Sequence, residues 1–244
     1  MIEIKNLTVQ FGGVRPIDEL SVCLDDAIVG LIGPNGAGKT TLLNVLSGFV
    51  APIRGTVCVD GKDVTHVAPH LRAAMGLRRT FQTDQIADDL TLWENVLAIA
   101  DHAGIGSQRE RADEVARAIE HVGLTRRIHR RGYALSTEER RLAEIAKALI
   151  GKPRLVMLDE PGAGMSTSES KHLESVLKGI PAYFGAQLFL IDHDVELIAA
   201  CCSQAMVLDF GKLLAVGATA AVLEQPDVRR AFLGTYDDVL RAAS

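Results

Sequence analysis

The chain has 244 residues, a length that suits one large α/β domain or a core with a small subdomain. Hydrophobic residues make up 48% and charged residues 23%, as in a globular protein, and the net charge of −5 argues against a nucleic-acid binder driven by bulk charge. The four cysteines lack CxxC spacing, no run reaches about 18 apolar residues, and the N-terminus lacks a signal peptide's layout, so we expect reduced thiols and a cytoplasmic location.

The first part of the chain is predicted to form strands around one helix. Residues 2–11 alternate apolar and polar side chains, as in a half-exposed antiparallel strand. Residues 27–33 are a nearly continuous apolar run, which is typical of a buried strand. Residues 39–49 have helical spacing, and residues 55–64 alternate again around Asp60-Gly61, a hairpin signal.

The rest of the chain is predicted to contain helices and then alternating strands and helices. A helical insertion is expected from about 90 to 131, and a capped amphipathic helix from 133 to 150. Three strands are expected at 154–161, 186–194 and 205–217, with a helix at 168–180 between the first two. Apolar strands separated by helices indicate an α/β fold with a parallel sheet covered on both faces.

A basic run at 125–131, "TRRIHRR", is the notable charge cluster. We interpret it as a solvated face, with contact to an acidic partner as the alternative.

The stretch "GPNGAGKTT", Gly33 to Thr41, fits the pattern G-x-x-x-x-G-K-[ST] at every fixed position. Its glycines allow backbone N–H groups to turn around a phosphate, Lys39 supplies a positive charge, and the Thr40 hydroxyl can bind Mg²⁺. The alternative is a glycine-rich turn without a ligand. The position between a buried strand and a helix favours the phosphate loop.

Polar residues follow two of the predicted strands. Asp159 is expected to hold Mg²⁺ through water, and Glu160 to act as general base on the attacking water. His193 is expected near the γ-phosphate, and Gln82 is expected to bind Mg²⁺. The alternatives are a helix cap for the acidic pair, a structural role for His193 and a plain surface position for Gln82.

In this order, these residues resemble the ATPase subunit of an ATP-binding cassette (ABC) transporter over essentially the whole chain. The resemblance implies a P-loop NTPase core, an N-terminal antiparallel β subdomain and a helical subdomain at about 83–150, within one domain over 1–244. It implies a Walker A motif at the phosphate loop, a Walker B motif at Leu155–Glu160, a Q-loop at Gln82 and a switch histidine at His193. Phe11 is expected to stack on adenine. The implied ATP-binding residues are Phe11, Gly33, Pro34, Asn35, Gly36, Ala37, Gly38, Lys39, Thr40 and Thr41.

The resemblance also implies partners. Two such subunits sandwich two ATP molecules, each between one chain's Walker motifs and the other chain's signature helix, and closure moves membrane permease subunits. ATP and Mg²⁺ are the implied cofactors, a substrate-binding protein is an indirect partner, and the expected location is the cytoplasmic face of the membrane. The segments at 9–20, 76–82, 90–97 and 217–234 resemble more narrowly the subunits that energise branched-chain amino acid uptake, although importers of urea or short amides share them.

Two other functions stay open. A non-transport ABC ATPase is one, but such proteins usually carry two cassettes or large extra domains. A regulatory nucleotide-binding module with little turnover is the other, and Asp159, Glu160 and His193 argue against it.

The signature, Leu135–Glu139, departs from the family's L-S-G-G-Q and reads L-S-T-E-E. Ser136 and Glu139 can form a capping box, S-x-x-E, which would occupy the helix N-terminus that should face the partner's ATP. Glu138 adds negative charge there, at a cost of about 4 kcal/mol for a separation near 4 Å. Ser166 stands where the D-loop usually has Asp or Asn. We therefore expect an asymmetric heterodimer with one degenerate site; the alternative is that Glu138 points to solvent and the helix works normally.

Overall fold

The computed structural model describes residues 1–231, which form two compact units. One unit comprises residues 1–69 and the chain from residue 189 onward, and the other comprises residues 70–188. The last three residues of the tail pattern, 232–234, lie outside the described residues.

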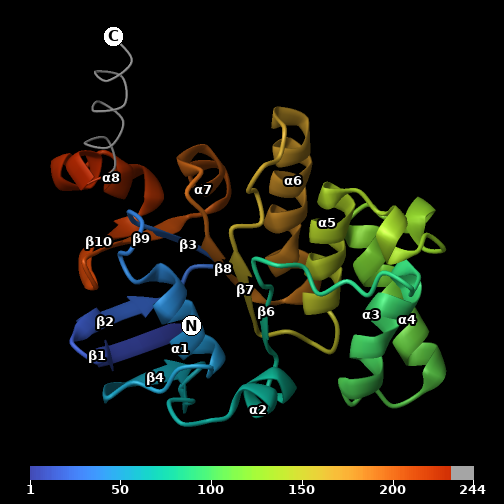
Figure 1. The fold of residues 1–244 in the computed structure, drawn as a ribbon, viewed down its shortest axis with the longest axis horizontal. Coiled ribbons are helices and arrows are strands. Elements are labelled where there is room, and N and C mark those ends of the chain that lie inside the picture. The colour runs from blue at the N-terminus through green and yellow to red at the C-terminus, as the bar shows by residue number, and fades with distance from the viewer. Residues whose placement is uncertain (232–244) are drawn as a thin grey trace. The chain divides into compact units, whose positions relative to one another are not determined.

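The first unit contains a four-stranded antiparallel sheet in the order β2-β1-β4-β5, drawn in blue in Figure 1. Ile2 lies opposite both Leu24 and Val59, so apolar side chains of three strands share one buried face. The antiparallel strand predicted at the N-terminus is thus confirmed. The strands are β1 (Ile2–Phe11), β2 (Val14–Leu24), β4 (Arg54–Val59) and β5 (Lys62–Asp63).

The predicted hairpin between β4 and β5 is confirmed. Asp60 has φ +49° and Gly61 has φ +74°, so both central residues of the two-residue turn are left-handed. An Asp-Gly pair tolerates this conformation better than other pairs do, which is why the sequence revealed the turn.

The same unit contains β3 (Ile28–Ile32), which pairs in parallel with β9 (Gln204–Asp209). The expectation of a single strand over 205–217 is wrong. The chain reverses at Phe210-Gly211, where φ is +43° and +78°, and returns as the antiparallel strand β10 (Lys212–Ala218). An apolar residue at the first turn position gave no turn signal, and Gly211 alone marked the reversal.

The helices of this unit are α1 (Lys39–Ser47), α7 (Val195–Cys201) and α8 (Thr219–Leu223).

In the second unit, β6 (Leu77–Arg79) pairs in parallel with the fully buried strand β7 (Leu155–Asp159). The helical insertion is confirmed, because α3, α4 and α5 pack against one another, as the green and yellow-green part of Figure 1 shows. The helix expected from 133 begins later, since residues 132–134 form a 3₁₀ turn. The helices are α2 (Pro69–Ala74), α3 (Leu92–His102), α4 (Gln108–His121), α5 (Thr137–Ala148) and α6 (Thr167–Phe184). Strand β8 (Gln187–Ile191) contains the division between the two units.

The structure also shows the state of the cysteines and the character of the helices. All four cysteines are free thiols, and burial raises the pKa of the Cys202 thiol, which keeps it unreactive. Among residues 1–231, no helix combines the length and apolar character needed to cross a membrane.

Candidate functional site

The phosphate loop connects β3 to α1 in the first unit and depends on glycine for its path. Gly38 has φ +104°, and a Cβ there would lie 2.1 Å from the carbonyl oxygen of Pro16. A Cβ on Gly33 would lie 2.3 Å from the carbonyl oxygen of Leu208. No side chain fits at either position. Gly36 has φ +81° but open space around it, so only its backbone conformation favours glycine there.

The Lys39 side chain folds back over this loop. Its Nζ donates hydrogen bonds to the carbonyl oxygens of Gly33 at 2.6 Å and Pro34 at 3.0 Å, and the residue is only 8% exposed. The positive charge therefore stays beside the loop's own amides. The next residue, Thr40, is exposed on the first turn of α1.

The N-terminus of α1 differs from those of the other long helices. Its N-cap is Gly38, without a side-chain cap, and no acidic residue lies in its first turn. The helices α3, α4, α5 and α6 each begin with a complete capping box that includes a glutamate. Because a helix N-terminus carries partial positive charge, α1 offers uncapped N–H groups and dipole to an anion, whereas the others neutralise theirs.

Asp159 ends β7 in the second unit and is almost fully buried. Its Oδ2 accepts a hydrogen bond from Nη2 of Arg79 at 3.2 Å, and its backbone N–H lies 3.4 Å from Oγ1 of Thr80. Burial lowers the pKa of Arg79, and the Asp159 carboxylate opposes that change. The Arg79 guanidinium also lies 5.0 Å from the centre of the Phe81 ring. A buried ion pair thus connects the end of β6 to the predicted metal ligand.

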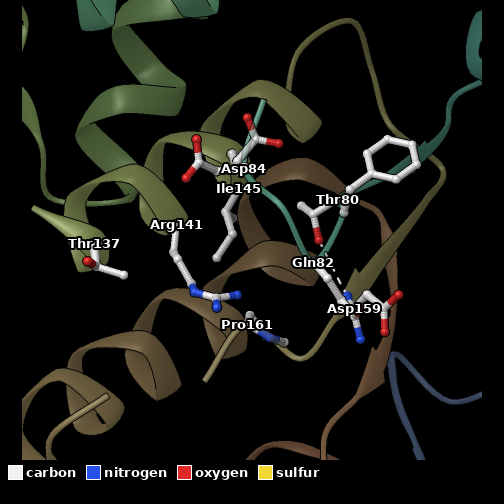
Figure 2. A pocket seen from close by; sticks show the side chains of 10 residues that line it. Thr80, Gln82, Asp84, Thr137, Arg141, Ile145, Asp159 and Pro161 are labelled. Atoms are coloured by element: carbon white, nitrogen blue, oxygen red, sulfur yellow. Dashed lines mark hydrogen bonds between the residues drawn. The ribbon is translucent and has the colours of Figure 1, made fainter. Parts of the chain in front are cut away.

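A cavity of about 60 Å³ lies beside this pair, with room for a few water molecules. Gln82, Asp159 and Pro161 line it, together with Thr137 and Arg141 of α5. Figure 2 shows these side chains around one space, with Arg141 extending from α5 toward the segment that carries Pro161. The structure therefore brings two predicted metal ligands, Gln82 and Asp159, to one cavity.

Glu160 follows β7 with φ +51°, a conformation that costs a residue other than glycine about 1–3 kcal/mol. Nη1 of Arg141 donates a hydrogen bond to its carbonyl oxygen at 3.1 Å, which helps to hold this turn. Backbone strain of this kind is common where a side chain must be aimed at a ligand.

His193 and Phe11 belong to the first unit. The His193 side chain is 63% exposed, and its Nδ1 lies 3.7 Å from Oδ1 of the buried Asp192. Asp192 also accepts a hydrogen bond from the backbone N–H of Asp194 at 3.0 Å, so its carboxylate is fixed. Phe11 ends β1 and is 53% exposed, which leaves its ring available for stacking.

The capping box predicted at the signature is confirmed. The Ser136 side chain accepts from the backbone N–H of Glu139, and Oε2 of Glu139 accepts from the backbone N–H of Ser136 at 3.0 Å. Nε of Arg127 donates to Oε1 of Glu139 at 2.5 Å, and Arg130 lies 3.8 Å from its Oε2. Burial opposes ionisation, but the bonds from Ser136 and Arg127 hold the pKa of Glu139 below its usual value. Arg127 and Arg130 of the basic run remain 41% and 47% exposed, in agreement with a solvated face, and they also contact Glu139 of the same chain.

The neighbour of Glu138 is another acidic residue, whereas Glu139 has two arginines beside it. The half-buried side chain of Glu138 lies within hydrogen-bonding reach of Glu169 on α6. Glu169 forms the capping box of α6 with Ser166, whose hydroxyl donates to Oε2 of Glu169 at 2.6 Å. Two of the positions at which the sequence departs from the family pattern, Glu138 and Ser166, are thus connected through one glutamate.

Sequence reasoning missed three arginines: Arg79, Arg140 and Arg141. The available signals were the pairs Arg78-Arg79 before Gln82 and Arg140-Arg141 after the signature. Nothing local identified their partners, because the contacts of Arg79 and Arg140 span 80 and 52–56 residues.

Comparisons with known proteins agree on the family. The family model described as ABC transporter matches residues 18–163. The high-affinity branched-chain amino acid transport ATP-binding proteins BraF of Pseudomonas aeruginosa and LivG of Escherichia coli are each 32% identical, over 96% of this chain and 98% of theirs. The lipopolysaccharide export system ATP-binding protein LptB of Haemophilus influenzae is 30% identical, over 96% of this chain and 97% of its own.

Solved structures share the fold. The ADP conformation of MJ1267, an ATP-binding cassette of an ABC transporter, superposes with a TM-score of 0.85 at 26% identity, over 96% of this chain and 98% of that one. The dimeric cassette MJ0796 shares the fold with a TM-score of 0.78 at 21% identity, over 90% of this chain and 99% of that one. The α/β fold with an N-terminal antiparallel sheet and a mostly parallel sheet covered by helices is confirmed.

Proposed function

The chain belongs to the ABC transporter family and is an ATPase that couples ATP hydrolysis to transport, and we propose that it energises an importer of branched-chain or other hydrophobic amino acids. The observation that carries this proposal is the 32% identity to two branched-chain amino acid transport ATPases over 96% of this chain and 98% of each relative. The cargo itself would be selected by permease and substrate-binding subunits, and the permease subunits would hold the cassette at the cytoplasmic face of the membrane.

Uptake in cells tests this cargo. Deletion of the chain's gene should abolish uptake of labelled leucine, and the intact gene should restore it, whereas a gene carrying Lys39→Ala should not. Uptake of labelled lysine serves as the control and should stay unchanged. Normal leucine uptake in the deletion strain would contradict the proposed cargo.

ATP fits the phosphate loop. The α1 N-terminus and the Lys39 ammonium would bind the β- and γ-phosphates, while Phe11 would stack on adenine. The glycine positions at which a Cβ meets backbone atoms, and the absence of an acidic residue from the first turn of α1, support this assignment.

We propose Thr40, Gln82 and Asp159 as Mg²⁺ ligands, because each side chain offers a hard oxygen donor of the kind that Mg²⁺ prefers. A bound Mg²⁺ would neutralise charge on the phosphates during phosphoryl transfer. Glu160 would accept a proton from the attacking water, and His193 would donate a hydrogen bond to the γ-phosphate. Arg79 donates a hydrogen bond to Oδ2 of Asp159 at 3.2 Å, which helps to hold the carboxylate at the end of β7.

The second cassette of the transporter is proposed to be a different chain. Ser136 and Glu138 face the partner's ATP in this proposal, and Ser136 is already engaged in its own capping box. Glu138, which lies beside Glu169 of α6, would repel the γ-phosphate. One composite site would then be competent and the other degenerate.

This asymmetry is tested by ATP turnover of the assembled transporter after removal of either subunit's catalytic glutamate. Glu160→Gln in this chain removes turnover at the site completed by the partner's signature. The equivalent change in the partner removes turnover at the site completed by Leu135–Glu139 and leaves the site completed by the partner's signature, so this variant should keep more turnover than Glu160→Gln. Equal residual turnover in the two variants would contradict the proposal.

A further inference from the structure

The residue that follows the signature, Arg140, is held by an unusually complete set of bonds. Its Nε and Nη2 donate to both oxygens of Asp84, at 3.1 and 2.8 Å, as a bidentate pair. Its Nη1 donates to Oδ1 of Asp88 and to the carbonyl oxygen of Gly132, each at 2.8 Å. Its Nη2 also donates to the carbonyl oxygen of Ile86 at 3.3 Å. A guanidinium has five N–H donors, so every donor of Arg140 is used.

These bonds connect two segments that are distant in sequence. Asp84, Ile86 and Asp88 belong to the Gln82 segment, residues 82–91, whereas Arg140 lies in the first turn and a half of α5, directly behind the signature. The hydrogen bonds that Arg140 donates to Asp84 and Asp88 raise the pKa of Arg140, so its charge persists at any ordinary pH. A lysine could keep the charge, but it could not reproduce the planar fork.

The backbone of the Gln82 segment also packs against the approach to the signature. Gly132 N–H donates to the carbonyl oxygen of Leu90 at 2.8 Å, and Tyr133 N–H donates to that of Asp88 at 3.2 Å. A Cβ on Gly132 would lie 2.4 Å from the carbonyl oxygen of Ala87, so only glycine allows this approach. The two segments therefore touch closely enough to move as one piece.

Two further side chains, Asn95 and Lys147, hold the backbone of the Gln82 segment. The buried Asn95 of α3 accepts from the backbone N–H of Ala87 at 2.8 Å and donates to its carbonyl oxygen at 3.1 Å. Nζ of Lys147, near the end of α5, donates to the carbonyl oxygen of Gln85 at 2.7 Å. Arg140 is the member of this set that contacts both the Gln82 segment and Gly132, the first residue of the 3₁₀ turn that precedes the signature.

We propose that Arg140 is a positioning residue that transmits the position of the Gln82 segment to the signature helix, so that nucleotide contact at Gln82 sets the placement of Ser136 and Glu138. This inference rests on the proposed roles of Gln82 and of the signature. Arg140 forms charge-assisted pairs with Asp84 and Asp88 and hydrogen bonds to two carbonyl oxygens. These contacts hold the Gln82 segment and the start of α5 together as one rigid body, and coupling between two sites requires such a connection.

Hydrogen exchange on the purified full chain tests this coupling. The parent is Glu160→Gln, in which Mg-ATP is retained, and exchange is followed in residues 84–91 and 132–136 with and without Mg-ATP. We expect Mg-ATP to slow exchange in both segments of the parent. With Arg140→Lys added, exchange without nucleotide should rise about tenfold or more in both segments, since several charge-assisted hydrogen bonds are lost. Mg-ATP should still slow residues 84–91 but no longer residues 132–136.

Arg109→Lys is the matched control, since Arg109 is exposed on α4 and the same chemical change there should preserve both responses. Should Arg140→Lys not fold, Asp88→Asn provides the same test at a side chain that is 64% exposed, and Asp88→Glu should restore the joint response. The proposal is wrong if residues 132–136 still respond to Mg-ATP in these variants, or if bound Mg-ATP affects neither segment of the parent. Failure of Mg-ATP to bind at all would instead refute the proposed function.

Discussion

Glu138→Gln isolates the charge that distinguishes this signature from one with glycine. The substitution keeps the length and hydrogen-bonding capacity of the side chain and removes one negative charge. Glu139 needs no such test, because Arg127 and Arg130 already compensate its charge. Glu138 lies beside Glu169 on α6 instead, so it is the residue whose charge the substitution tests.

The magnitude follows from distance and exposure. At 4 Å and an effective dielectric constant near 20, a carboxylate and a phosphate charge repel by about 4 kcal/mol. Glu138 is only half-buried, and water screens such pairs, so we reduce the expected value to about 1–2 kcal/mol. That corresponds to a factor of about 5–30 in ATP affinity at the partner-facing site.

The assay is the KM for ATP of the transporter assembled with its permease subunits, with the partner's own catalytic glutamate intact. Glu138→Gln should lower this KM by about fivefold or more, and the effect should shrink as salt is added. Glu120→Gln removes the same charge from an exposed position on α4 and should change nothing. An unchanged KM in Glu138→Gln, or an equal shift in the control, would refute the reasoning.

Two further predictions concern stability. Gly38→Ala should lower the free energy of unfolding by about 3 kcal/mol or more, because its Cβ would lie 2.1 Å from the carbonyl oxygen of Pro16. Gly36→Ala places its Cβ in open space and should lower the free energy of unfolding by only about 1 kcal/mol. Urea unfolding of both variants measures the difference, and equal midpoints would contradict it. The pKa values of the Asp84 and Glu139 carboxyls are lowered below the usual 3.8 and 4.5. Their contribution to stability is therefore present above those usual values and is lost as the pH falls through the lower folded-state values. Arg140→Lys and Arg127→Gln should weaken this acid dependence, which is measured by thermal unfolding between about pH 6 and pH 3.

Local signals predicted the parts of the fold that depend on neighbouring residues. The Asp60-Gly61 turn adopts its conformation because these two residue types tolerate positive φ. The S-x-x-E pattern at Ser136–Glu139 predicted a capping box because both partners lie in one helical turn. The glycine pattern likewise predicted the phosphate loop. The structure adds a reason for glycine that the sequence does not contain, because backbone atoms of the same chain occupy the space of a Cβ at Gly33 and Gly38.

Contacts between distant segments had no such signal. Arg79 and Asp159 are 80 residues apart, and Arg140 and Asp84 are 56 apart, so no window of sequence contains both partners. The contact between Arg127 of the basic run and Glu139 was not predicted, because Glu139 was assigned to the helix cap alone. The reversal at Phe210-Gly211 was hidden because an apolar residue continued the strand pattern through the turn.

The two helix N-termini that face nucleotide in the proposed dimer have opposite chemistry within one chain. The α1 N-terminus has a glycine cap and no acidic residue, so an anion can approach its N–H groups and dipole. At α5, Ser136 and Glu139 satisfy the first-turn groups, and Glu138 adds charge of the wrong sign. In the proposed heterodimer, each composite site uses the α1 terminus of one subunit and the signature of the other, so a partner with a different signature would complete this chain's own nucleotide site. The proposed asymmetry therefore rests on which helix ends are capped by their own side chains.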